Sequence, residues 1–152
     1  MARVSARTFP FTPRLTSDVE VGDFWGIRLR RGGWYACGRV LRLDSRVMLT
    51  VGLLDWCEPA PPTSERIGGA RVLDWGVAHV KTVELTGGRL LGHRDLAEDG
   101  GLVHLVGVSA DALGDEPVWG YLSIEDKAHD RFGRHFPEEG TQATERPSAL
   151  SG

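Results

Sequence analysis

Val21-Gly22-Asp23-Phe24-Trp25-Gly26-Ile27-Arg28-Leu29-Arg30 is the stretch that decides the fold, together with the turn Arg31-Gly32-Gly33 and the run Trp34-Tyr35-Ala36-Cys37-Gly38-Arg39-Val40-Leu41-Arg42-Leu43 that follows it. Two apolar, aromatic-rich runs around a charged Gly-Gly turn predict a β-hairpin. In the first run Trp25, Ile27 and Leu29 alternate with the other residues, which predicts one buried face and one face in contact with water. Glycines in the middle of both runs, Gly26 and Gly38, are typical of a bulge or a sharp bend.

The runs after the hairpin extend it into a meander. A third strand is predicted over residues 46–54, after the polar turn Asp44-Ser45, and a stiff proline-rich loop over 55–62. Further strands are predicted over residues 71–85, 89–92, 102–108 and 118–124, and a short helix over 125–132 that ends at Gly133. Six or seven strands with one or two short helices indicate a mainly all-β protein. The sheet is expected to be either a small curved antiparallel sheet or a partly open SH3-like barrel.

The chain of 152 residues has the length of one domain with tails. Residues 1–18 are predicted to be an extended N-terminal arm, since Pro10 and Pro13 exclude a helix interior, and Phe9 and Phe11 are expected to pack on the body. Residues 19–136 are predicted to form a single β-rich domain. Residues 137–152 have no apolar periodicity, which predicts a disordered C-terminal tail.

Charge and hydropathy restrict the partners. The formal net charge is −3, so bulk electrostatics do not draw the chain to nucleic acid or to an anionic membrane. No apolar run approaches the ~20 residues of a membrane-spanning helix, and the N-terminal segment lacks the apolar core of a secretory signal. These patterns predict a cytoplasmic protein, in which Cys37 and Cys57 stay reduced.

Motifs that would indicate catalysis are weak. His93-Arg94-Asp95 repeats the three letters of the protein-kinase catalytic loop, but no glycine-rich phosphate loop and no Asp-Phe-Gly accompany it. Cys37 with His79 or His104 is the one conceivable nucleophile and base, and Cys37 lies inside a predicted strand without a strained turn to expose it. The sequence therefore predicts a protein that is not an enzyme and has no cofactor.

A metal site is not predicted either. Asp126 and His129 share one face of the predicted helix, and Asp130 and His135 lie close to them in sequence. This set lacks a second ligand pair with sharp spacing. A solvated charged helix face is the favoured interpretation.

Arginine and aromatic residues gather in the first hairpin, and acidic residues gather in the later loops. Trp, Tyr and Arg are the residue types that dominate protein–protein hot spots. The predicted partner-binding residues are Arg30, Arg31, Trp34, Tyr35 and Arg39. The alternative is that the tryptophans belong to the core and the charges to an ordinary surface.

The two runs of the hairpin, Val21–Leu29 and Gly33–Leu41, resemble the opening of the family named immunity protein twenty-six. That family begins with a Gly-Asp-aromatic strand, a short turn and a strand that reads roughly Tyr-x-x-Gly-Arg-Val. The resemblance implies a small cytoplasmic protein that binds and neutralises a polymorphic toxin and has no catalysis of its own.

Other functions remain open. Similar Gly-Asp openings occur in SH3-like barrels, including the endoribonuclease toxins of toxin–antitoxin pairs. Those toxins use an Arg with a Ser or Thr, for which Arg39 and Thr50 are the nearest candidates. A nucleic-acid-binding barrel or ribonuclease toxin is thus the second hypothesis. An accessory domain of a phage or secretion assembly is the third.

Overall fold

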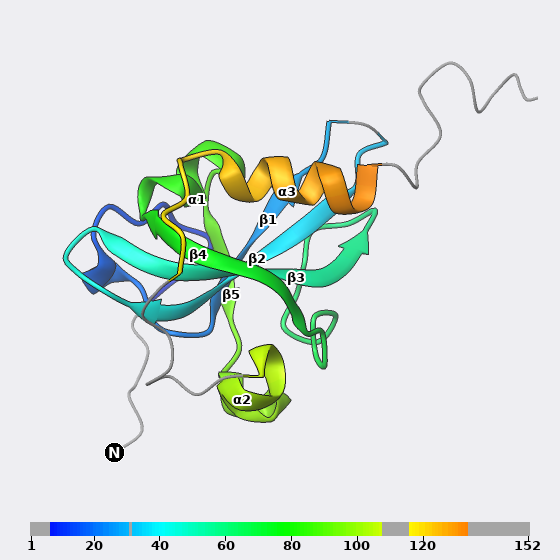
Figure 1. Ribbon diagram of the computed structural model, residues 1–152. Coiled ribbons are helices and arrows are strands. Elements are labelled where there is room, and N and C mark those ends of the chain that lie inside the picture. The colour runs from blue at the N-terminus through cyan, green and yellow to red at the C-terminus, as the bar shows by residue number, and fades with distance from the viewer. Residues whose placement is uncertain (1–6, 31, 108–115, 134–152) are drawn as a thin grey trace, which may run out of the picture.

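The computed structural model describes residues 7–30, 32–107 and 116–133. Its centre is a five-stranded antiparallel sheet in the order β4-β3-β2-β1-β5 (Figure 1). The strands are β1 (Asp23–Arg28), β2 (Tyr35–Leu43), β3 (Met48–Glu58), β4 (Val72–His79) and β5 (Leu90–His93). The expected mainly-β class with a small antiparallel sheet and short helices is confirmed. The sheet is open, with β4 and β5 at its edges, and does not close into a barrel.

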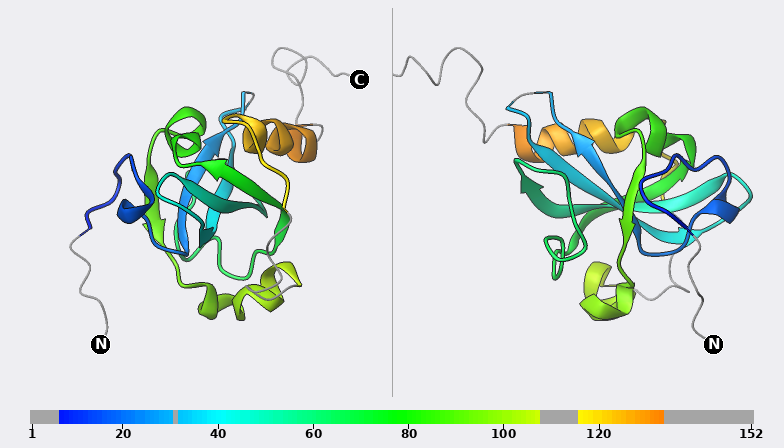
Figure 2. Two further views of the ribbon diagram at one scale, coloured as in Figure 1. Left: turned by 60° about the vertical axis from the view of Figure 1, so that its left-hand side comes forward. Right: turned by 180° about the vertical axis from the view of Figure 1, so that it is seen from behind.

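Helices cover both faces of this sheet. The α-helices are α1 (Lys81–Thr86), α2 (Gly101–Val106) and α3 (Ser123–Phe132), and two 3-10 turns are η1 (Thr16–Asp18) and η2 (Leu96–Asp99). Figures 1 and 2 show α1 and α3 on one face and α2 on the other. The prediction that one face of the hairpin meets water is therefore wrong, because β1 is buried from Asp23 to Ile27 and only Arg28 is exposed.

Each face has its own apolar cluster. The first cluster joins β1, β2 and β3 to α1 and α3 through residues that include Trp25, Ile27, Val40, Val51, Val83, Ile124 and Phe132. The second cluster lies under α2 and the loop before β4, and includes Phe24, Cys37, Leu41, Leu54, Trp56, Ile67 and Leu105. The sheet thus forms the middle layer of three.

The first hairpin is confirmed, and the register explains one of its glycines. The pairing of β2 with β3 shifts between Ala36 and Gly38, which is the irregularity that the mid-strand glycine predicts. A Cβ on Gly38 would lie 2.5 Å from the indole of Trp25 on the neighbouring strand. Gly38 therefore makes room for Trp25, a fully buried tryptophan of the first cluster.

Three later predictions of strand are wrong. Residues 71–85 split into β4 and α1, residues 102–108 contain α2, and residues 118–124 contain one isolated bridge and the start of α3. β3 also runs on to Glu58, through half of the predicted proline-rich loop. The short return strand and the helix that ends at Gly133 are confirmed as β5 and α3.

Irregular segments cover part of both sheet edges. On β5, the N-terminal arm pairs through Phe11, whose N–H donates to the carbonyl of Leu90 at 3.2 Å and whose carbonyl accepts from Leu90 at 2.8 Å. On β4, Val77 forms an isolated parallel bridge with Val118. As expected, Phe9 and Phe11 pack against the body. The tail predicted over residues 137–152 lies outside the described residues.

Among the described residues, no helix has the length and apolar character needed to cross a membrane.

Candidate functional site

The predicted contact residues Arg30, Trp34 and Tyr35 lie at the turn of the first hairpin, between β1 and β2. The N–H of Leu29 donates to the carbonyl of Trp34 at 2.9 Å and closes the turn. Gly32 and Gly33 have φ values of +71° and +68°, in the left-handed region that favours glycine. Figures 1 and 2 show the end of this hairpin projecting beyond α3.

Arg30 ties the hairpin to α3. Its side chain is 66% exposed and its Nη2 lies 3.5 Å from a carboxylate oxygen of Glu125 and 3.8 Å from one of Asp126. Its backbone N–H donates to Nε2 of His129 at 3.1 Å. The projecting turn is therefore held at its base by a helix.

The aromatic residues of the turn lie on opposite faces of the sheet. Trp34 is half-buried against the first cluster, and Tyr35 is half-buried against the second. The guanidinium carbon of Arg28 lies 5.7 Å from the centre of the Tyr35 ring, a cation–π arrangement. We name Arg28, Arg30, Trp34 and Tyr35 the hairpin surface. Arg31 lies outside the described residues.

Arg39, the fifth predicted contact residue, is not on the surface. It is fully buried, and its Nη1 donates to Asp99 at 2.9 Å. Its Nη2 donates to the carbonyls of Arg94 at 2.6 Å and Asp95 at 3.1 Å. A partner has no access to this guanidinium, so this prediction is corrected. The sequence carried a signal for it, because Arg39 alternates in phase with Cys37 and Leu41, which belong to the second cluster.

Asp99 is the centre of a buried ionic cluster. It accepts from Nε and Nη2 of Arg94, both at 2.9 Å, from Arg39, and from the N–H of Gly69 at 2.8 Å. The hydrogen bonds from Arg94, together with those from Gly69 and Arg39, outweigh the effect of burial. They hold the pKa of Asp99 well below its usual range.

Two sequence motifs meet at a second ionic cluster. Asp23 of the Gly-Asp pair lies 2.8 Å from Nδ1 of His93, and Asp95 lies 2.6 Å from Nε2 of the same ring. Arg7 of the arm donates from Nη2 to Asp23 at 2.9 Å, and Arg94 donates its N–H to the carbonyl of Gly22 at 3.1 Å. The His93-Arg94-Asp95 motif therefore links β5 to β1 and, through Asp23, to the N-terminal arm.

The contacts of this cluster favour the imidazolium form of His93. Both ring nitrogens face carboxylate oxygens, so both must donate. Burial lowers the pKa of His93, but the hydrogen bonds with Asp95 and Asp23 outweigh that effect and raise the pKa above its ordinary value. An imidazole with both nitrogens engaged does not act as a general base without breaking one of these contacts.

Neither cysteine is arranged as a nucleophile. Burial raises the pKa of Cys37 far above its ordinary value, and burial with the neighbouring Glu58 raises the pKa of Cys57 to about 11. The two thiols are free and pack against opposite faces of the sheet. A protonated thiol is a poor nucleophile and a poor metal ligand.

Three of the four residues considered as metal ligands, Asp126, His129 and Asp130, lie in the described part of the chain. His129 is occupied by the hairpin, and His135 lies outside the described residues. Among the residues that the structure describes, no three His, Cys, Asp or Glu side chains gather in a way that would hold a metal ion.

No family model matches the chain, and neither the curated proteins nor the solved structures contain a significant match to it.

Proposed function

We propose that this protein is a non-catalytic binding protein of the bacterial cytoplasm that neutralises a polymorphic toxin by occluding the toxin's active site. The observation that carries the proposal is the hairpin surface, which places two exposed arginines and two half-buried aromatic rings on a projecting turn. Arginine, tryptophan and tyrosine supply most of the binding energy at protein interfaces. The resemblance of the hairpin to immunity protein twenty-six supports the same function.

The shape of the hairpin surface fits this mode of inhibition. Arg28 and Tyr35 lie on one side of the turn, and Arg30 and Trp34 on the other, so a cleft that admits the turn meets side chains on both of its walls. Contacts from α3 to Arg30 fix the turn before binding. A turn that is already ordered loses less conformational entropy when it binds.

The ribonuclease alternative is less well supported. Its candidate residues, Arg39 and Thr50, are both fully buried. Arg39 pairs with Asp99, and the hydroxyl of Thr50 donates to Asp44 at 2.8 Å. Neither group is free to meet a substrate in this arrangement.

The test is a pull-down of the tagged full chain from its native cell, with nuclease treatment and identification of the eluate by mass spectrometry. The expected result is one stoichiometric protein that is toxic when expressed alone and harmless when expressed with this chain. Loss of all bound material after nuclease treatment would overturn the proposal in favour of nucleic-acid binding. Capture of a non-toxic phage or secretion component would overturn it in favour of an accessory domain.

The hairpin surface is tested by the double variant Arg28→Glu/Tyr35→Ala, which changes one exposed and one half-buried side chain. It should abolish both capture and protection. Glu84→Gln, a charge change at an exposed position of α1, is the control that should leave both intact. Full capture by the double variant, with a normal circular dichroism spectrum, would exclude the Arg28 and Tyr35 side of the hairpin surface as the contact.

A further inference from the structure

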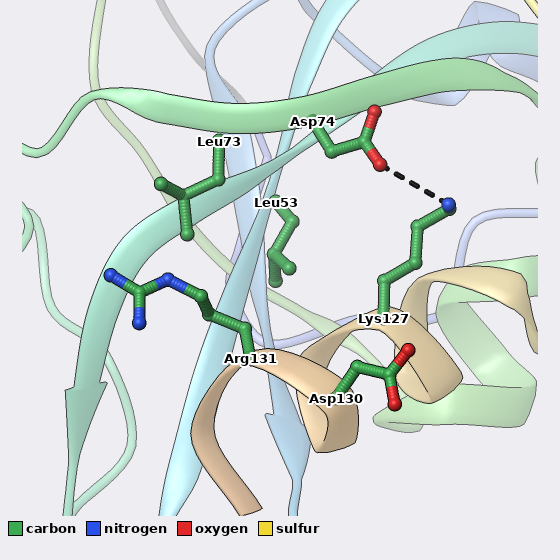
Figure 3. Close-up of a pocket in the computed structure, with 6 residues that line it drawn as sticks. All are labelled: Leu53, Leu73, Asp74, Lys127, Asp130 and Arg131. Atoms are coloured by element: carbon green, nitrogen blue, oxygen red, sulfur yellow. Dashed lines mark ion pairs between the residues drawn. The ribbon is translucent and has the colours of Figure 1, made fainter.

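A groove of about 380 Å³ lies between β4 and α3. The residues that line it come from β3, β4 and α3 and are Leu53, Leu73, Asp74, Lys127, Asp130 and Arg131. Figure 3 shows the two leucines on the strand side, between the side chains of Lys127 and Arg131 from the helix. This groove is on the opposite flank of α3 from the residues that hold Arg30.

The floor of the groove is apolar. Leu53 is fully buried there, whereas Leu73 beside it is 38% exposed and is one of the larger apolar side chains left open to water. Covering the open part of Leu73 with an apolar group from another molecule is favourable in proportion to the area removed from water. The volume admits one aliphatic or aromatic side chain together with its flanking backbone.

Both cations at the groove are already engaged. Nζ of Lys127 lies 3.1 Å from a carboxylate oxygen of Asp74 and 5.1 Å from the centre of the Trp119 ring. Nη2 of Arg131 lies 3.4 Å from a carboxylate oxygen of Asp55. An incoming carboxylate would have to compete with Asp74 or Asp55 for these two cations.

Asp130 is the exception among the charged residues of the groove. It is exposed, and within the described ranges no ion pair or hydrogen bond engages its carboxylate. Lys127 pairs with Asp74 inside the groove, and Arg131 pairs with Asp55 outside it, so Asp130 is the lining carboxylate that neither cation pairs with. Such a site attracts a cation more than an anion.

We infer that this groove binds a segment of the partner protein in which an apolar side chain stands next to a lysine or arginine. The apolar side chain covers Leu73, and the cation pairs with Asp130. The inference rests on the proposed function for the identity of the partner, and it adds that the toxin's contact surface carries positive charge beside an apolar residue. Positive surface of that kind is typical of enzymes that act on nucleic acid.

The experiment titrates the isotopically labelled full chain with short peptides and follows the backbone amide signals by NMR. The probe is acetyl-Gly-Leu-Arg-Gly-amide, compared with acetyl-Gly-Leu-Glu-Gly-amide and acetyl-Gly-Ser-Arg-Gly-amide. The first peptide should give saturable shifts centred on residues 73, 74 and 127–131, and the other two should bind more weakly. Asp130→Asn should weaken binding of the first peptide about two- to five-fold, as loss of an exposed ion pair does.

Leu73→Ser, which changes an exposed side chain, should weaken the same peptide about five-fold through lost apolar contact. Glu84→Gln makes the same charge change as Asp130→Asn at an exposed position of another helix and should leave the affinity unchanged. Equal binding of the Leu-Glu peptide, or an absence of saturable shifts, would overturn the inference. So would a dimer by light scattering that Leu73→Ser dissociates, because the occupant would then be a second copy of the chain.

These outcomes are separate from those of the pull-down. If the Leu-Arg peptide binds selectively but the captured partner is not toxic, the groove inference stands and the proposed toxin-neutralising function fails. If a toxin is captured and binds Asp130→Asn and the unaltered chain with the same affinity, the proposed function stands and the groove inference fails.

Discussion

Replacing Asp99 with alanine should strongly destabilise the protein. The substitution removes the acceptor of four hydrogen bonds, two of them from Arg94, one from Arg39 and one from the N–H of Gly69. It also leaves two guanidinium groups without their shared counter-charge. Arg94 retains 17% side-chain exposure and can recover contact with water, whereas the side chain of Arg39 has none.

The magnitude follows from the burial of Arg39. Removing one partner of a buried ion pair costs about 3 to 5 kcal/mol, because the remaining charge has neither partner nor water. Arg39 keeps its bonds to the carbonyls of Arg94 and Asp95, which places the expected loss toward the lower end of that range. Since the pKa of Asp99 is lowered in the folded protein, its stabilisation is present above pH ~4 and is lost as the pH falls toward the folded-state pKa.

Urea denaturation at pH 7, followed by the fluorescence of the five tryptophans, measures the free energy of unfolding of Asp99→Ala. Glu98→Gln is the matched control, because Glu98 also approaches Arg94, at 3.6 Å, but is 56% exposed. The control should change stability by no more than about 0.5 kcal/mol. A loss below about 1 kcal/mol for Asp99→Ala would refute the assignment of Arg39 as a buried cation that depends on Asp99.

Other predictions concern the second ionic cluster, the strand packing and the thiols. The pKa of His93 is raised on folding, so its contribution to stability should be present below pH ~6.5 and lost as the pH rises through the folded-state pKa. The urea midpoint should therefore fall more steeply from pH ~6 to ~9 for the unaltered chain than for His93→Asn. Parallel curves would contradict the bridging imidazolium. Gly38→Ala should destabilise the protein by about 1 to 3 kcal/mol, since the new methyl group meets Trp25, whereas Gly133→Ala, with no atom within 4 Å and a helical φ, should be close to neutral in the same assay. Cys37 and Cys57 should react slowly with a thiol reagent at pH 7.5 in the native protein and together release two equivalents in denaturant; a fast native phase would contradict the raised pKa values of both thiols.

The hairpin was predictable because its signals are local. Alternation, a Gly-Gly turn and mid-strand glycines all act over ten residues or fewer, and β1, β2 and the register shift at Gly38 follow from them. The helices α1 and α2 were missed for a related reason. Each has six residues, fewer than two turns, so its apolar periodicity is too short to outweigh the β-branched Val80, Val83, Val103 and Val106. These short helices are stabilised by packing against the sheet, and that long-range contact leaves no signal in the local sequence.

The surface position of the predicted contact residues could be read from the sequence at the turn but not inside β2. Arg30, Trp34 and Tyr35 lie at the turn where the local pattern placed them. Arg39 was grouped with them by residue type, but its partner Asp99 lies 60 residues further along the chain. His93 and Asp23 are 70 residues apart, so the Gly-Asp pair and the His93-Arg94-Asp95 motif cannot be linked from the local sequence of either one. Long-range ionic pairs of this kind require the fold before they can be recognised.

The position of β5 sets an order for synthesis and folding. β1 to β4 follow one another as neighbours, whereas β5 pairs with β1 after an excursion that separates Asp23 from His93 by 70 residues. At ribosomal rates of 5 to 20 residues per second, β1 has one unpaired edge for roughly 4 to 14 s after it is made. During that interval its apolar strand is open to association with other nascent chains. Pairing with β5, secured by Asp23 and His93, ends that exposure. A chain truncated before residue 90 would therefore keep this edge of β1 unpaired and should be more prone to aggregate.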